Sequence, residues 1–305
     1  MSVVTWSIFI IIFTVEFIIG SLGNGFIAVL YYIYWTKRGK ISLADKILTG
    51  LAVSRIFFIW LTVVNILLHM FPSDFLNIEI FPSVLFLWSV ASHFSTWFAT
   101  CLSIFYFFKI ANFSNSTFLY LKWRIKKVVS VTLLASLVLL FANIVLLNIH
   151  GIIWVDEHKR NASFNSKFKS YGRNSKFIIY IFIFWFVIPF QVSLTTSLLL
   201  IFSLRKHLKR MQHSAKGPRD ASTTAHIKAL HTVITFLLLY TIFFISHVVQ
   251  VWDSNLIHHT LAIFLCQTAG MAFPSGHSCV LILANTKLRQ GSLSMLWWLR
   301  RSLKS

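Results

Sequence analysis

Hydrophobic residues gather into seven long runs along this chain, and shorter polar segments between the runs hold most of the Lys and Arg. Each run is long enough for a helix rising about 1.5 Å per residue to cross the hydrocarbon core of a bilayer. The pattern therefore predicts an all-α integral membrane protein, a seven-transmembrane helix bundle in one domain. We place the helices at residues 8–34, 42–69, 81–110, 128–149, 177–204, 229–251 and 259–284 of the full span 1–305.

The basic residues predict the orientation of the bundle, because cytoplasmic loops are enriched in Lys and Arg. Most of the 28 Lys and Arg fall into segments that lie inside when the N-terminus is outside. The polar segment before the fifth run is the exception, since it would lie outside and is also basic. Seven crossings then place the C-terminus inside. After the seventh run, Leu293, Leu296 and Trp297 oppose Ser294 and Arg301, so the tail could lie along the membrane as a short amphipathic eighth helix.

Composition supports a membrane protein and narrows its chemistry. Hydrophobic residues make up 57% of the chain and charged residues 12%, with a mean hydropathy of +0.74, whereas soluble domains carry about 25% charged residues. The net charge of +20 does not indicate a nucleic-acid partner, because the cations form separate clusters between apolar runs. Cys101, Cys266 and Cys279 lie inside apolar runs, without the spacing of a disulfide framework or a metal site. We expect no metal and no cofactor.

The third run carries small polar residues on one helical face. They recur at steps of three or four: Ser89, Ser92, Thr96, Thr100 and Ser103. Such a face has no reason to meet lipid, so we expect it to point at other helices or at a cavity. The run has Trp88 in its outer half and becomes basic at Lys109, as expected for a helix that links a ligand-facing end to a cytoplasmic end.

Three polar residues fall inside the first two predicted helices. Glu16 and Asn24 lie in the first and Arg55 in the second. The depths of Glu16 and Arg55 are within about two turns of each other, and Asn24 lies slightly lower. Ionisable groups in a membrane need a partner or a function. We therefore predict a polar cluster of Glu16, Asn24 and Arg55, which serves either as fixed packing or as part of a switch.

The segment Pro274-Ser275-Gly276-His277-Ser278 interrupts the seventh run. Membrane phosphatases of the phosphatidic acid type use a similar Pro-Ser-Gly-His segment. Those enzymes also need an Arg-Pro pair and a later His and Asp, but this chain has no Arg-Pro and no His, Asp or Glu after His277. We therefore expect no enzyme, and we expect the segment to be a Pro-Gly kink supported by neighbouring helices.

Several short sequence strings follow one another in an order and at a spacing that carry a family resemblance. The signature sequences of rhodopsin-like receptors are missing. Phe105-Tyr106-Phe107 stands where Asp-Arg-Tyr would, and His277-Ser278 stands where Asn-Pro would. The strings are Glu16 with Gly23-Asn24-Gly25-Phe26-Ile27, Leu51-Ala52-Val53-Ser54-Arg55, Leu102 to Ala111, Leu121-Lys122-Trp123-Arg124-Ile125, Pro189-Phe190, Leu199 to Leu204 with Lys206-His207, Lys216 to Asp220, Phe236 to Tyr240, and Leu281-Ile282-Leu283 with Asn285 and Lys287 to Gln290. The chain resembles the type 2 taste receptors, the bitter-taste family of G-protein-coupled receptors.

The resemblance implies a plasma-membrane receptor that binds small bitter compounds from outside. It would activate a gustducin-type G protein and, through phospholipase C, calcium signalling. The ligand-binding residues it implies are Trp88, Ser92, Asn65, Tyr240 and Gln267. Ser92 departs from the Asn that is common there in the family, which affects ligands recognised through that amide.

The resemblance also implies a G-protein-facing inner surface that includes Tyr106, Lys109, Arg124, Lys206 and Lys209. The same basic surface suits anionic membrane lipids. A glycosylation sequon at Asn161 lies in the predicted second outer loop. Two alternatives stay open: a small-molecule transporter, although no internal repeat is evident, and a chemosensory receptor for non-bitter ligands.

Overall fold

A computed structural model describes residues 3–39, 41–70, 80–160, 183–214, 221–252 and 260–302. Within these ranges the regular structure is helical and no strand occurs. The long helices are α1 Val3–Arg38, α2 Leu43–Met70, α3 Phe81–Ile110, α5 Ile125–Arg160, α8 Ile188–Ser214, α9 Ala221–Trp252 and α10 Thr260–Ala284. Shorter elements are α4 Ser116–Trp123, the π-helical turn η2 Ile183–Val187 and the tail helix α11 Thr286–Ser302. The predicted seven-helix membrane bundle is confirmed.

Six of the long helices are apolar and long enough to cross a membrane, judged over the described residues. The seventh, α10, has no unbroken apolar stretch of that length, because it contains Gln267 and the polar segment around Pro274. The polar residues Ser275, His277 and Ser278 are nevertheless buried inside the bundle. α10 therefore fits as a crossing helix that turns its polar face inward, and its helix continues through Pro274.

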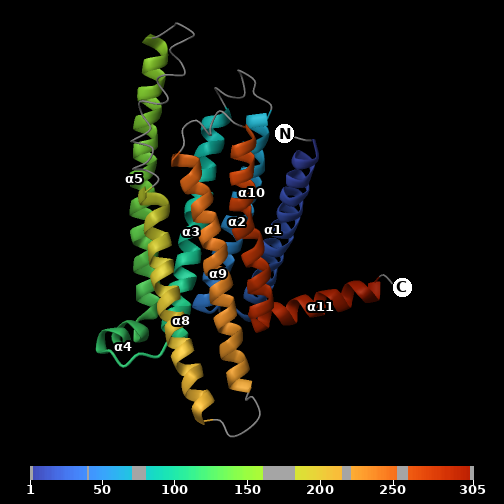
Figure 1. Cartoon of the computed structure of the whole chain (residues 1–305), viewed down its shortest axis with the longest axis vertical. Coiled ribbons are helices and arrows are strands. Elements are labelled where there is room, and N and C mark those ends of the chain that lie inside the picture. Colours follow the sequence, from blue (N-terminus) through green and yellow to red (C-terminus); the bar gives the residue numbers. More distant parts are fainter. Residues whose placement is uncertain are drawn as a thin grey trace.

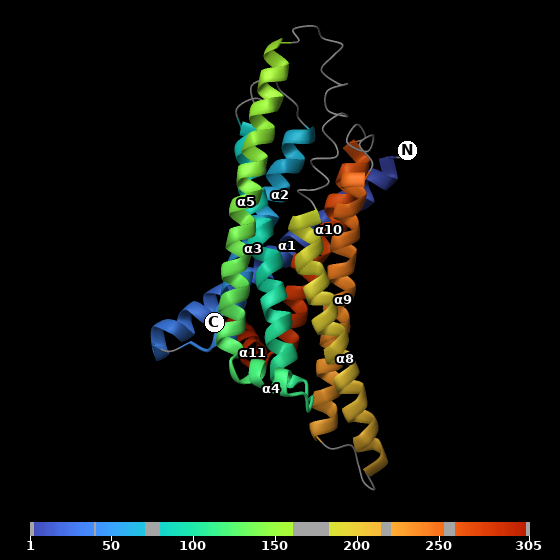
Figure 2. The same ribbon diagram turned by 90° about the vertical axis from the view of Figure 1, so that its left-hand side faces the viewer.

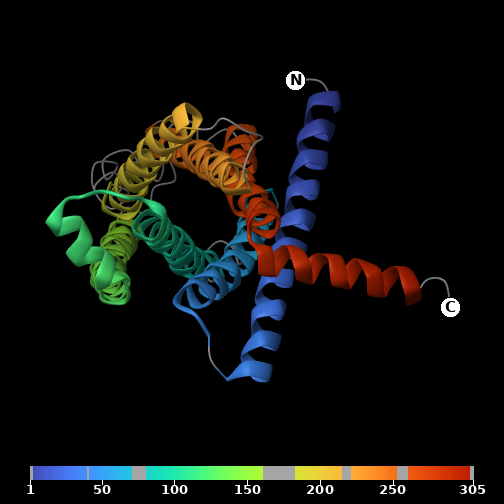
Figure 3. The ribbon, with the colours of Figure 1, turned by 90° about the horizontal axis from the view of Figure 1, so that it is seen from below.

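Seen from below, α2, α3, α8, α9 and α10 form a ring, and α1 lies alongside it (Figure 3). Neighbours in the ring are α2 and α3, α3 and α8, α8 and α9, and α9 and α10, while α1 packs against α2 and α10, and α5 packs on the outside of α3. The N-terminal end of α1 lies at one end of the bundle, and α4 and α11 project from the other end (Figures 1 and 2). We call these the outer and the inner end.

Side-chain caps fix several helix starts at the inner end. Ser42 and Asp45 exchange hydrogen bonds with each other's backbone N at the start of α2, at 3.2 and 3.4 Å, which is a capping box. Asn115 caps α4 by accepting from the backbone N of Thr117 at 2.8 Å. The sequence pattern predicted no helix between residues 110 and 128, because α4, at 8 residues, is too short to show a clear hydrophobic period.

Glycines let α1 approach α2 and α10 closely. A Cβ on Gly20 would clash with Ser275 Oγ and would lie 2.7 Å from Ile59 Cδ1. A Cβ on Gly23 would lie 2.7 Å from Ser278 Oγ. Small residues at such contacts are typical of membrane helix packing, and here they bring α1 against the polar side of α10.

Candidate ligand-binding site and inner face

An aromatic cluster fills the outer half of the bundle. It consists of Phe58 on α2, Trp88 on α3, Phe186 on η2, and Phe243 and His247 on α9, and we call it the outer aromatic cluster. The Trp88 ring stacks on His247 with 5.9 Å between centroids and 17° between planes. The Trp88 Nε1 donates a hydrogen bond to Thr62 Oγ1 at 3.0 Å. Side chains from three helices therefore converge at Trp88.

His247 lies at the centre of the outer aromatic cluster, and the sequence interpretation missed it. Its ring centroid is 4.3 Å from that of Phe243 and 4.6 Å from that of Phe186. Nδ1 donates to the backbone oxygen of Phe243 at 2.9 Å, which leaves Nε2 as a buried acceptor with no partner among the described residues. The signal was present in the sequence, since His247 is an ionisable residue inside an apolar run.

Of the five predicted ligand-binding residues, four lie in or near the outer aromatic cluster, by their positions along the helices or through one hydrogen bond. Trp88 belongs to it, and Ser92 is buried one turn further in on α3. Asn65 lies one turn from Thr62, on the same face of α2. Gln267 of α10 donates to Gln250 Oε1 at 3.2 Å. The side-chain oxygens of Ser92 and Asn65 are buried and have no hydrogen-bond partner among the described residues.

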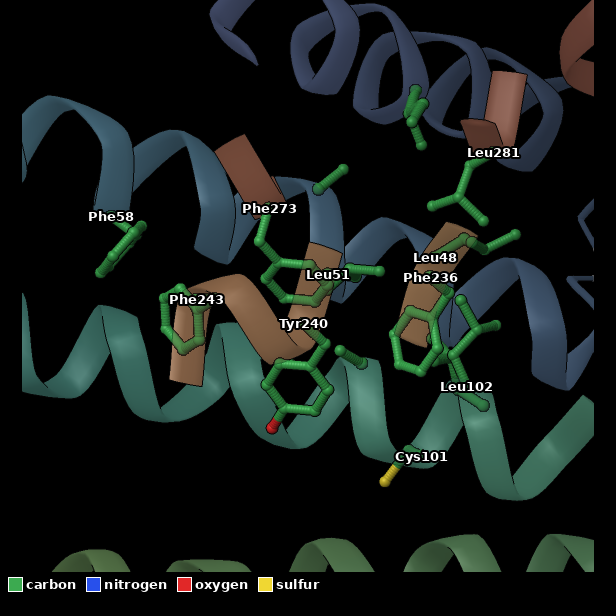
Figure 4. Packing of buried hydrophobic residues seen from close by; sticks show 14 of the residues in the cluster. Leu48, Leu51, Phe58, Cys101, Leu102, Phe236, Tyr240, Phe243, Phe273 and Leu281 are labelled. Atoms are coloured by element: carbon green, nitrogen blue, oxygen red, sulfur yellow. The ribbon is translucent and has the colours of Figure 1, made fainter. Parts of the chain in front are cut away.

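Tyr240 lies two turns further in than His247 and belongs to the middle of the bundle. Its ring stacks on Phe273 of α10 at 4.8 Å and 13°. Phe236 and Phe190 contact its other sides at 5.7 and 5.5 Å. Figure 4 shows Tyr240 between Phe243 and Phe236 along α9. Tyr240 therefore connects the outer aromatic cluster with the inner half.

The structure divides the predicted polar cluster. Arg55 Nη2 donates to His277 Nδ1 at 2.9 Å, and its guanidinium lies 4.6 Å from the centre of the Phe273 ring. Asn24 donates to the backbone oxygen of Pro274 at 3.1 Å. Both residues thus bond to α10, and neither bonds to Glu16.

Helix register explains why Glu16 is separate. Gly20 of α1 lies against Ile59 of α2. The two helices are antiparallel. Asn24, four residues after Gly20, therefore lies level with Arg55, four residues before Ile59. Glu16 lies on the other side of the Gly20 contact, four residues before Gly20. Along α1 it is eight residues from the level of Arg55, which is about 12 Å at 1.5 Å per residue. This agrees with the depth estimate from the sequence, about two turns, but a separation of two turns is too large for Glu16 to pair with Arg55.

A small cavity lies in the inner half beside His277. Its volume open to a water-sized sphere is about 30 Å³, which is room for ordered water. Because the guanidinium of Arg55 only donates, Nδ1 of His277 accepts, and the ring proton is on Nε2. The lining comes from α3, α8, α9 and α10: Ala99, Leu102, Ser103, Tyr106, Ser197, Leu200, Thr232, Val233, Phe236, His277 and Leu281.

The inner end presents the predicted basic surface. Lys109, Arg124, Lys206 and Lys209 are exposed, and Tyr106 is half-buried at the cavity wall. The predicted sequon at Asn161 lies outside the described residues. Among the described residues, no three His, Cys, Asp or Glu side chains come together in a way that could hold a metal ion.

Comparisons with known proteins agree with this architecture. A family model described as taste receptor protein (TAS2R) matches residues 1–300. The chain is 52% identical to taste receptor type 2 member 140 of Rattus norvegicus over 95% of this chain and 94% of the relative. It is 50% identical to taste receptor type 2 member 14 of Macaca mulatta and of Homo sapiens, each over 98% of this chain and 94% of the relative. The chain belongs to the type 2 taste receptors, the bitter-taste family of G-protein-coupled receptors, which are multi-pass proteins of the plasma membrane.

Proposed function

We propose that this receptor binds small bitter compounds at the outer aromatic cluster, and that its inner end activates a gustducin-type G protein. The observation that carries the proposal is the position of Trp88. Its indole stacks on His247 of α9 and bonds to Thr62 of α2. A molecule inserted beside this ring would contact three helices at once.

The chemistry of the outer aromatic cluster favours flat, largely apolar ligands. Its members offer ring faces, and the buried oxygens of Ser92 and Asn65 offer hydrogen bonds to a ligand donor. The cluster contains no carboxylate, so a cationic ligand would rely on cation–π attraction, worth about 0.5–2 kcal/mol. We therefore expect loose binding of chemically diverse compounds.

The centre of the bundle offers a physical route from ligand to G protein. Phe243 of the outer aromatic cluster contacts Phe273 at 5.4 Å, and Phe273 contacts both Tyr240 and His277. His277 bonds to Arg55 and lines the inner cavity. An agonist that favours one packing of these rings would shift the receptor toward its active state by its differential affinity.

The inner end supplies the proposed surface for the G protein. Tyr106 lies at the cavity wall, and Lys109, Arg124, Lys206 and Lys209 are exposed cations at the same end of the bundle. A cationic surface of this kind attracts an acidic partner over distances of a Debye length, about 8 Å at physiological salt. Movement of α3 against α8 and α9 would alter the spacing of these residues.

Calcium imaging in cells that express the receptor with a gustducin-type Gα subunit tests the proposal, using a panel of bitter compounds. We expect Trp88→Ala to raise the half-maximal agonist concentration at least about tenfold, because it removes stacking and a hydrogen bond. Trp60→Ala is the matched control, since Trp60 is 53% exposed on the outside of α2.

Three results would contradict parts of the proposal. Equal losses in Trp88→Ala and Trp60→Ala, at equal surface expression, would exclude the outer aromatic cluster as the binding site. A response that persists without the Gα subunit would exclude G-protein coupling. Activation by non-bitter compounds alone would support the chemosensory alternative.

A further inference from the structure

Two histidines face each other where α8 and α9 run side by side to the inner end (Figures 1 and 2). The ring centres of His207 on α8 and His226 on α9 are 4.7 Å apart, with 32° between the ring planes. His207 is exposed and His226 is half-buried. Among the described residues, neither imidazole has a hydrogen-bond partner. The ring nitrogens are therefore open to a ligand that enters from the inner end.

The packing of α8 against α9 brings the two rings together. Leu204 of α8 and Val233 of α9 belong to one buried apolar cluster, and Leu230 packs against it. His207 lies three residues after Leu204, and His226 lies four residues before Leu230, so each histidine continues the contact face of its own helix by one turn. The pairing therefore follows from the way the two helices meet.

The spacing of the rings fits one metal ion held between them. An ion about 2.1 Å from one nitrogen of each ring lies about 3.2 Å from each ring centre. Ring centres 4.7 Å apart then correspond to a nitrogen–ion–nitrogen angle of about 95°, between the values of about 90° and 109° for octahedral and tetrahedral coordination. Imidazole nitrogen suits Zn²⁺, Cu²⁺ and Ni²⁺, whereas Mg²⁺ and Ca²⁺ prefer oxygen ligands.

The cations that neighbour the pair in sequence point away from it. At about 100° per residue around a helix, Lys206 projects about 100° from the direction of His207, and Arg205 and Lys209 each project about 160° from it. Lys228 of α9 is turned toward α10, where its Nζ donates to a backbone oxygen at 2.8 Å. The side on which the two rings meet is therefore not occupied by these charges.

We propose that His207 and His226 bind a divalent transition-metal ion of the zinc class at the inner end, with water completing its coordination. Each helix supplies one nitrogen ligand, so the ion ties the inner ends of α8 and α9 together at the separation seen here. Binding of the ion depends neither on the outer aromatic cluster nor on a G protein. The two ligands are far apart in the sequence, on different helices, so no short metal-binding motif reveals the site.

Thermal unfolding of the full-length receptor in nanodiscs tests the site, with ZnCl₂ as the probe and a purification tag that contains no histidine. An ion that binds the folded state raises the unfolding temperature. We expect His207→Gln and His226→Gln each to raise the Zn²⁺ concentration for half of this effect at least about tenfold. The double variant should lose no more than either single variant, because the two rings share one ion.

Two controls separate the site from general metal binding. His231→Gln changes an exposed histidine elsewhere on α9 and should keep the Zn²⁺ effect of the unmodified receptor. MgCl₂ should leave the unfolding temperature unchanged, because Mg²⁺ prefers oxygen ligands. Without metal, the variants should unfold at the temperature of the unmodified receptor, since both histidines lie at the edge of the bundle.

Electron paramagnetic resonance of bound Cu²⁺ gives a second readout that does not depend on unfolding. Each coordinating imidazole nitrogen splits the copper signal, so His207→Gln and His226→Gln should each remove one nitrogen from the same copper ion. The proposal is overturned if the single variants keep the Zn²⁺ effect, if their losses add up in the double variant, or if His231→Gln loses as much as His207→Gln.

Discussion

The outer and inner halves of the bundle are held together by different chemistry. In the outer half, rings from three elements, α3, η2 and α9, pack around His247, and the described residues there make few hydrogen bonds between helices. In the inner half, Arg55 bonds to His277 across two helices, and Ser103 bonds to Thr196 at 2.6 Å. Ring packing tolerates rearrangement around a guest, whereas buried hydrogen bonds require defined partners. The outer half is therefore suited to varied ligands, and the inner half to a small number of defined arrangements.

The largest effect is expected where the inner half loses a buried hydrogen bond. Arg55→Ala removes a fully buried side chain and leaves His277 Nδ1 without a donor. We expect the free energy of unfolding to fall by about 3 kcal/mol or more. Thermal unfolding of the purified receptor in detergent measures the change, and Lys46→Ala, at an exposed position of α2, is the control.

A double substitution tests whether the hydrogen bond itself matters. Arg55→Met with His277→Leu removes both partners and fills the space, so it should be more stable than Arg55→Ala alone. If Arg55→Ala unfolds at the same temperature as Lys46→Ala, the inner half does not depend on this bond. The contrast between the two halves would then be wrong.

A smaller loss of stability is expected where α1 packs closely against α2 and α10. Gly20→Ala places a Cβ against Ser275 and Ile59, so those helices must separate, at a cost of about 1–2 kcal/mol. Gly25→Ala on the same helix meets nothing within 4 Å and should leave stability unchanged or slightly raised, because Ala favours helix over Gly. Thermal unfolding compares the two, and equal melting temperatures would show that the close approach does not contribute.

The seven-helix fold could be predicted because bilayer thickness imposes long apolar runs. The segment around Pro274 also showed that α10 had polar residues to bury. The short helix α4 was not predicted, because its 8 residues are too few to show a clear hydrophobic period and its start depends on a side-chain cap, Asn115. The fold class therefore follows from the composition and from the length and spacing of the apolar runs, whereas short helices depend on local side-chain contacts.

Residue pairing inside the bundle was less predictable than the fold. The polar cluster was expected to join Glu16 with Arg55, but depth along a helix does not give the register, which close contact at Gly20 sets. His277 belongs to the segment that interrupts the seventh apolar run, but its bond to Arg55 depends on the three-dimensional arrangement of α2 and α10, which the sequence does not give. His247 was missed, although its place in an apolar run was a usable signal.

The smallest effect is expected at the outer edge of the ligand site, where Gln267 donates to Gln250. This is a neutral, half-buried hydrogen bond, so Gln267→Ala should raise the half-maximal agonist concentration only about two- to fivefold, corresponding to 0.5–1 kcal/mol. Gln250→Ala should have a similar effect, and the double variant should add little more, because the two residues share one bond. Calcium responses of the three variants at matched surface expression measure this coupling. A loss as large as that of Trp88→Ala would mean that Gln267 contacts the ligand directly, and the outer half would then use a hydrogen bond as well as ring packing to select its ligands.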